Sequence, residues 1–179
     1  MRVLIIDDHP IVRKGIRALL EEYPDVDVVG ESSGGTDTLA LCAELAPDIV
    51  LLDIKLENGD GINLCRALRQ TLPAVRIIIL TSYADENYLV SSLRSGAHGY
   101  LLKSSSPEIL VDTLRAVQAG ERRVSESLIT TALKSVERLA NEQQSSTEDL
   151  SDEEMQLLKL LADGATNKII ASRMYMSER

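Results

Sequence analysis

Short runs of branched apolar residues recur along the first two thirds of the chain, each followed by a segment with helical spacing. We predict strands over 2–7, 26–30, 48–53, 76–81 and 98–102, and helices over 11–22, 35–45, 61–70, 86–95 and 107–119. Strands without polar alternation are typical of a parallel sheet that is covered on both faces. Five strand–helix repeats with short connections therefore predict an α/β fold, a doubly wound five-stranded parallel sheet with right-handed crossovers.

Polar residues suited to phosphoryl chemistry follow four of these apolar runs. They are Asp7 and Asp8 after the first run, then Asp53, Thr81 and Lys103. Ligands of an open parallel sheet bind outside the carboxyl ends of its strands. Each residue alone has a simpler explanation, as a strand-end turn, a helix cap or a surface charge. Because all five follow strands of one sheet, we expect them to form one site.

Three carboxylates at such a site would repel one another, because like charges at close range cannot all ionise cheaply. A hard divalent cation resolves this conflict, and Mg²⁺ binds a few carboxylates while it keeps several waters. One aspartate could then attack a phosphoryl donor and form an acyl phosphate. Lys103 would supply a cation for the transferred group and Thr81 a hydroxyl donor.

The last third of the chain has a different pattern. The sequence predicts a polar linker helix with one apolar stripe over residues 125–143. Residues 142–149 have nothing to bury, and they predict a flexible joint. A capping box follows, with Ser151 as the N-cap and Glu154 three positions later. We expect one short helix that ends at Gly164, a second to about residue 174, and the start of a third near Ser177.

Composition narrows the class of protein. The net charge of −9 over 179 residues argues against a general polyanion binder. Cys42 and Cys65 lack metal-type spacing and are expected to be reduced, buried thiols. The chain starts in a strand without a basic leader, and no apolar run approaches the roughly 20 residues of a membrane span. We expect a cytoplasmic protein without a membrane partner.

The polar strand ends carry a resemblance to a known family. The matching segments are Asp7-Asp8, Asp53, Thr81-Ser82 and Tyr100-Leu101-Leu102-Lys103. They resemble the response-regulator receiver domain, which has the CheY-like fold. The segments 150–154 and 164–171 resemble the start of a LuxR-type helix-turn-helix domain. Together the two parts resemble the NarL/FixJ family of two-component transcription factors.

The resemblance implies a division into three parts. Residues 1–121 would be the receiver, residues 122–147 the linker helix and flexible joint, and residues 148–179 the first part of an all-α helix-turn-helix domain. The helix that begins near Ser177 would be the one that enters the major groove. The sequence holds only its first residues, so we expect a shortened form or fragment of a longer regulator that does not bind DNA by itself.

The resemblance also assigns roles at the acidic site. Asp53 would accept a phosphoryl group from a sensor histidine kinase. Asp8 would bind Mg²⁺ directly and Asp7 through water, with Asp53 and the backbone carbonyl of Lys55 as further ligands. Lys103 would form an ion pair with the phosphoryl group.

The same resemblance implies a switch and a set of partners. Thr81 and Tyr100 would be the switch pair, in which the hydroxyl moves toward the phosphoryl group and the ring turns inward. Promoter DNA would be the target of the complete protein, which would form a homodimer on phosphorylation. No enzymatic activity is expected beyond self-catalysed phosphorylation and dephosphorylation.

Three other classes of protein share some of these sequence features. A phosphatase of the haloacid dehalogenase type places a second aspartate two residues after its nucleophile, where this chain has Lys55. A dinucleotide-binding domain needs a glycine-rich turn after its first strand, where this chain has His9 and Pro10. A phosphorylation-controlled interaction module without DNA binding stays open. His9 itself fits a helix start better than a catalytic base.

Overall fold

The computed structural model describes residues 1–57, 59–82 and 86–124. The expected linker helix, the flexible joint and the helix-turn-helix segment 148–179 lie outside these described residues. The described part contains no helix that is both long and apolar enough to cross a membrane.

A six-stranded sheet forms the centre of the described fold. Its strands are β1 (Arg2–Ile6), β2 (Asp27–Ser32), β3 (Ile49–Leu52), β6 (Arg76–Thr81), β7 (Gly99–Leu102) and β8 (Arg123–Val124). Their order is β2-β1-β3-β6-β7-β8, and each neighbouring pair is parallel. The predicted doubly wound α/β fold is confirmed, with the short edge strand β8 as an addition. A two-residue strand is too short to produce a hydrophobic period, so the sequence pattern gave no sign of it.

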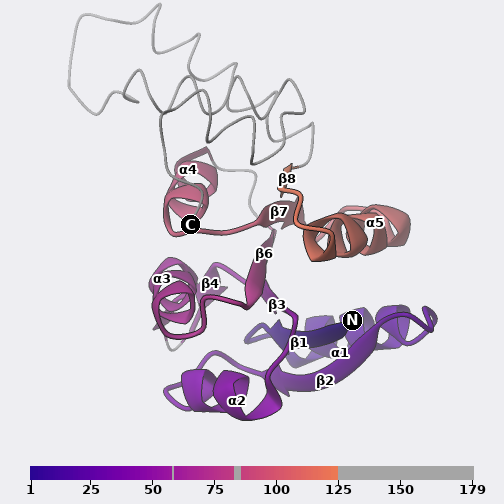
Figure 1. The fold of residues 1–179 in the computed structure, drawn as a ribbon, viewed down its shortest axis with the longest axis horizontal. Coiled ribbons are helices and arrows are strands. Elements are labelled where there is room, and N and C mark those ends of the chain that lie inside the picture. The colour runs from indigo at the N-terminus through magenta and orange to yellow at the C-terminus, as the bar shows by residue number, and fades with distance from the viewer. Residues whose placement is uncertain (58, 83–85, 125–179) are drawn as a thin grey trace, which may run out of the picture.

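Five helices cover the two faces of this sheet. They are α1 (Pro10–Leu20), α2 (Thr38–Leu45), α3 (Gly61–Thr71), α4 (Glu86–Arg94) and α5 (Pro107–Gln118). Figure 1 shows α1 and α5 on one side of the sheet and α2, α3 and α4 on the other. Both faces of the sheet are therefore covered by helices, as expected for a doubly wound sheet.

Each central strand contributes side chains to two hydrophobic cores. In β3, Ile49 and Leu51 belong to the core under α1 and α5, and Val50 and Leu52 to the core under α2, α3 and α4. All four side chains are at most 1% exposed. Burial on both faces is the reason why these strands appear in the sequence as continuous apolar runs.

The structure differs from the prediction in the loops around the site. Helix α2 begins three residues later than expected, at Thr38, with Asp37 as its N-cap. Two short strands, β4 (Lys55–Leu56) and β5 (Gly59–Asp60), form an antiparallel pair between β3 and α3. This small hairpin begins two residues after Asp53 and shapes the loop beside it.

Gly61 joins the hairpin to α3 by a close backbone contact. Its N–H donates to the carbonyl of Ile54 at 2.9 Å. A Cβ at position 61 would lie 2.2 Å from the carbonyl oxygen of Asp53 and 2.7 Å from the Cα of Ile54. Asp60 caps the helix, and its carboxylate accepts a hydrogen bond from Ile62 N at 2.9 Å. The start of α3 is thus packed directly on the backbone that carries Asp53.

We predict that Gly61→Ala lowers the free energy of unfolding by about 1–3 kcal/mol, because the methyl group forces this backbone contact apart. Urea unfolding followed by circular dichroism measures the change. Gly15→Ala is the matched control. Position 15 is exposed in α1, and a Cβ added there would meet no atom of the described residues within 4 Å. The control should gain stability, by about 0.5–1 kcal/mol. Equal stability of Gly61→Ala and the native chain would contradict the prediction.

Candidate functional site

Two buried aspartates lie where neighbouring strands end. Asp7 follows β1 and its N–H donates to the carbonyl of Ser32 at 3.0 Å; Asp53 follows β3 and its N–H donates to the carbonyl of Ile6 at 2.8 Å. These bonds extend the sheet pairing by one residue past each strand. The two residues are only 2% and 4% exposed. Their carboxylates are therefore held at the carboxyl edge of the sheet by backbone contacts.

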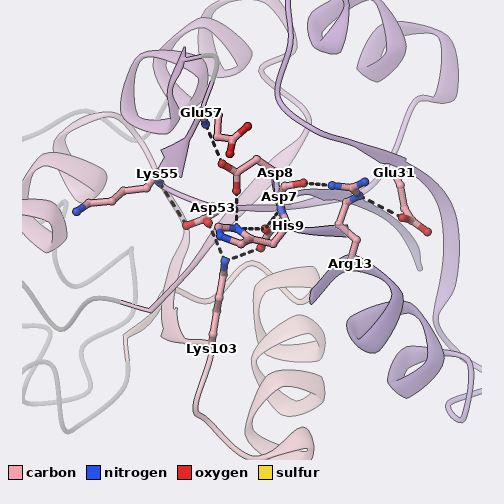
Figure 2. A network of polar contacts seen from close by, with 9 residues as sticks. All are labelled: Asp7, Asp8, His9, Arg13, Glu31, Asp53, Lys55, Glu57 and Lys103. Carbon is pink, nitrogen blue, oxygen red and sulfur yellow. Dashed lines mark hydrogen bonds and ion pairs between the residues drawn. The ribbon is translucent and has the colours of Figure 1, made fainter. Parts of the chain in front are cut away.

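Lys103 lies between these two carboxylates. Its ammonium Nζ is 2.6 Å from Asp7 Oδ2 and 2.7 Å from Asp53 Oδ2 (Figure 2). Its backbone N–H donates to the carbonyl of Thr81 at 2.7 Å, which fixes the residue at the end of β7. The structure thus brings together the ends of β1, β3, β6 and β7, as the strand pattern predicted.

Burial sets the charge balance of this cluster. It raises the pKa of Asp53, and the nearby charge of Asp7 acts in the same direction, against the lowering effect of Lys103. Burial tends to lower the pKa of Lys103, but hydrogen bonds to Asp53 and Asp7 outweigh it, so the pKa of the ammonium is raised. Lys103 therefore stays charged near neutral pH and offsets only part of the negative charge around it.

Asp8 completes the acidic group, and its two carboxylate oxygens have different partners. Its Oδ2 accepts a hydrogen bond from the N–H of Glu57 at 2.8 Å. Its Oδ1 is buried and makes no hydrogen bond with any described residue, although His9 Nδ1 lies 2.6 Å from it. A buried oxygen that lacks a well-formed hydrogen bond is costly unless a ligand satisfies it.

His9 starts α1 and also faces the acidic group. It is the N-cap of α1, with Pro10 at the first helical position, which confirms the helix-start interpretation. Its backbone N–H donates to Asp7 Oδ1 at 2.9 Å, and its ring Nδ1 lies 3.2 Å from the same oxygen. One ligand atom from each of Asp7, Asp8, His9 and Asp53 can be chosen so that all lie within 4.8 Å of one another.

A second polar network contacts the backbone carbonyl of Asp7. The Arg13 guanidinium donates to the Asp7 carbonyl and lies 3.3 Å from Glu31 Oε2, and Arg17 Nε lies 2.5 Å from Glu31 Oε1. The hydrogen bond from Arg17 lowers the pKa of Glu31. This network joins α1 to the edge strand β2. The strand and helix pattern does not predict this network, and the spacing of the two arginines, one helical turn apart, is its only signal in the sequence.

The remaining predicted site residues occupy three different environments. Thr81 is fully buried at the end of β6. Tyr100 is also fully buried, and its ring belongs to the core under α2, α3 and α4. The N–H of Lys55 donates to Asp53 Oδ1 at 3.3 Å, whereas its side chain extends away from the cluster, with Nζ 5.6 Å from the centre of the Tyr88 ring (Figure 2). The metal-binding role of the Lys55 carbonyl stays a prediction.

Comparison with known proteins places the chain in a family. Residues 3–115 match the response regulator receiver domain. The transcriptional regulatory protein LiaR of Bacillus subtilis is 37% identical over 177 residues, which cover 99% of this chain and 83% of LiaR.

Solved structures agree with this match. A LuxR-family two-component response regulator from an Aurantimonas species has a TM-score of 0.71 at 37% identity, over 77% of this chain and 97% of that one. A structure of two RcsB dimers bound to two parallel DNAs has a TM-score of 0.70 at 31% identity, over 99% of this chain and 84% of that one. The chain therefore belongs to the two-component response regulators of the LuxR/NarL family, and it carries their receiver domain.

Proposed function

We propose that Asp53 accepts a phosphoryl group from a sensor histidine kinase in a Mg²⁺-dependent reaction, and that this modification controls a DNA-binding transcription factor. The observation that carries the proposal is the buried cluster in which Lys103 bridges Asp7 and Asp53. Such a cluster combines a carboxylate nucleophile with a cation that can follow the transferred charge.

The residues present fit a Mg²⁺ ion. The donor set consists of hard carboxylate oxygens, which Mg²⁺ prefers, and the buried Oδ1 of Asp8 lacks a hydrogen bond within the described residues. Asp8 and Asp53 would bind the ion directly, Asp7 would bind it through water, and the Lys55 carbonyl would be a further ligand. When bound, the ion neutralises charge on the phosphoryl oxygens and orients the donor.

The chain's own groups then perform the transfer. A carboxylate oxygen of Asp53 attacks the phosphorus of the kinase phosphohistidine; the new P–O bond forms as the P–N bond breaks, and the kinase recovers its imidazole. Burial raises the pKa of Asp53, and Lys103 opposes this by stabilising the ionised form that must attack. Lys103 Nζ, now shared by two carboxylates, can pair with the new phosphoryl oxygens.

Thr81 and Tyr100 would transmit the change. The Thr81 hydroxyl would move toward the phosphoryl group, and the Tyr100 ring, which is already buried here, would occupy the space beneath it. A new dianion of this kind can bias a surface that has two stable arrangements.

We extend the proposal to the whole regulator. Residues 1–121 would be the receiver, residues 122–147 the linker and residues 148–179 the start of the helix-turn-helix domain. The complete regulator would dimerise on phosphorylation and bind promoter DNA. RcsB, which has been solved as dimers bound to DNA, supports the dimer and the DNA binding. The relatives are transcriptional regulators rather than classical enzymes, which favours this assignment over a phosphatase.

Incubation with acetyl phosphate and Mg²⁺ is expected to add one phosphoryl group, about 80 Da, to the native chain. Asp53→Asn should lose this adduct, and removal of Mg²⁺ by a chelator should prevent it. Intact-mass spectrometry measures both effects. Asp112→Asn is a matched control, because this aspartate is exposed on α5, and it should be labelled normally. An adduct that persists in Asp53→Asn, or no adduct on the native chain, would refute the assignment.

Lys103→Met is expected to change the phosphorylation rate and the affinity for Mg²⁺ in opposite directions. Loss of the ammonium removes a stabilising charge from the transition state, so the phosphorylation rate should fall on the order of 100-fold. The same change leaves Asp7 and Asp53 without their counter-charge, so the affinity for Mg²⁺ should rise. Time-resolved mass spectrometry and calorimetric titration measure the two quantities.

Lys14→Met serves as the control for this substitution, because Lys14 is exposed on α1. It should change neither quantity. A Lys103→Met variant that is phosphorylated at the native rate would show that the bridging ammonium has no part in the transfer.

A further inference from the structure

The acidic site includes the ring nitrogen Nδ1 of His9, although Mg²⁺ prefers oxygen ligands. His9 Nδ1 lies 2.6 Å from Asp8 Oδ1 and 3.2 Å from Asp7 Oδ1. Figure 2 shows the ring beside the three aspartates. The helix start does not explain this placement, because the His9 side chain makes no capping hydrogen bond to α1.

These distances match those between ligands of one metal ion. Two ligand atoms about 2.1 Å from an ion and at right angles to each other are about 3 Å apart, and two on opposite sides are about 4 Å apart. The two contacts of Nδ1 fall close to the first value, and the whole group of ligand atoms spans at most 4.8 Å. The four ligand atoms are therefore gathered closely enough to surround one position.

Two further observations point to a cation at this place. The Asp8 side chain is only 8% exposed, and its Oδ1 makes an ion-pair contact with His9 Nδ1 rather than a hydrogen bond with well-formed geometry, so a cation between the two atoms would bind both. The His9 side chain is 65% exposed, so an ion can reach Nδ1 from solvent without any opening of the fold.

We propose that His9 Nδ1 is a ligand of the divalent cation in the acidic site and makes the receiver prefer first-row transition metals over Mg²⁺. The proposal rests on the metal site of the proposed function and adds a nitrogen donor to it. Imidazole binds Co²⁺, Ni²⁺ and Zn²⁺ well and contributes little to Mg²⁺, which keeps oxygen ligands and water. The phosphorylation site would then bind different divalent ions with different affinities, depending on how well each ion binds imidazole.

Electron spin echo spectroscopy of the Mn²⁺-loaded native chain tests the contact directly. We expect nuclear modulation from a coordinated imidazole ¹⁴N. The chain has only two histidines. The other, His98, lies before β7, and its Nδ1 accepts a hydrogen bond from Ile77 N at 3.1 Å. Burial lowers the pKa of His98 to about 4, in keeping with a neutral structural residue. The untagged protein must be used so that no other imidazole is present.

His9→Asn isolates the nitrogen ligand, because asparagine is a preferred N-cap and leaves the start of α1 intact. The modulation should disappear in this variant. Calorimetric titrations should show the ratio of Co²⁺ to Mg²⁺ affinity falling by about tenfold or more. Asp8→Asn is the second variant, and it should weaken the binding of both ions if the nitrogen-ligated ion occupies the acidic site.

A native chain without ¹⁴N modulation would overturn the proposal, as would an unchanged affinity ratio in His9→Asn or modulation that persists there. These results are distinct from failure of the proposed function, which would appear as no Mg²⁺-dependent phosphoryl adduct on the native chain. A chain that accepts the phosphoryl group but shows no nitrogen coupling would leave the proposed function standing and refute the role of His9.

Discussion

One partly buried cation holds the carboxyl edge of the sheet together. Lys103 Nζ contacts the carboxylates of Asp7 and Asp53, and it reaches them from the end of β7 across the end of β6. Without this ammonium, two almost fully buried carboxylates would face each other with no counter-charge, which costs several kcal/mol in similar settings. The same contact opposes the rise that burial causes in the pKa of Asp53, and it places a cation where new negative charge would develop. Stability and reactivity therefore depend on one interaction.

The rest of the site is built on backbone contacts around that interaction. Gly61 packs on the backbone of Asp53 and Ile54, the N–H of Glu57 holds Asp8, and Arg13 holds the carbonyl of Asp7. These contacts come from α3, the small hairpin and α1, so both layers of helices take part. Because the backbone is fixed in this way, the loop does not rearrange to give Asp8 Oδ1 a hydrogen bond with good geometry. That oxygen and the raised pKa of Asp53 are local costs that the two hydrophobic cores offset.

The position of His9 shows how one residue can have a structural and a chemical role. As N-cap it begins α1, and its backbone N–H satisfies Asp7. Its ring is free to face the aspartates because the helix needs only its backbone. The sequence favoured the helix start alone, since a histidine before a proline is well explained by it. Only the folded geometry places Nδ1 at ligand distance from two carboxylates.

The sequence alone determined the parallel α/β sheet and the gathering of Asp7, Asp53, Thr81 and Lys103 at one edge. Both follow from short-range patterns, because strands buried on two faces must be apolar throughout and the carboxyl ends of parallel strands share one edge. Tertiary structure decided what local patterns do not encode. The strands of the β4–β5 hairpin and β8 are too short to show a hydrophobic period in the sequence. The contacts of Gly61, Arg13 and His9 depend on sharp turns of the backbone or on segments that are separated in the sequence. Those features depend on how elements pack against one another, and packing is set by the whole fold rather than by any stretch of the chain.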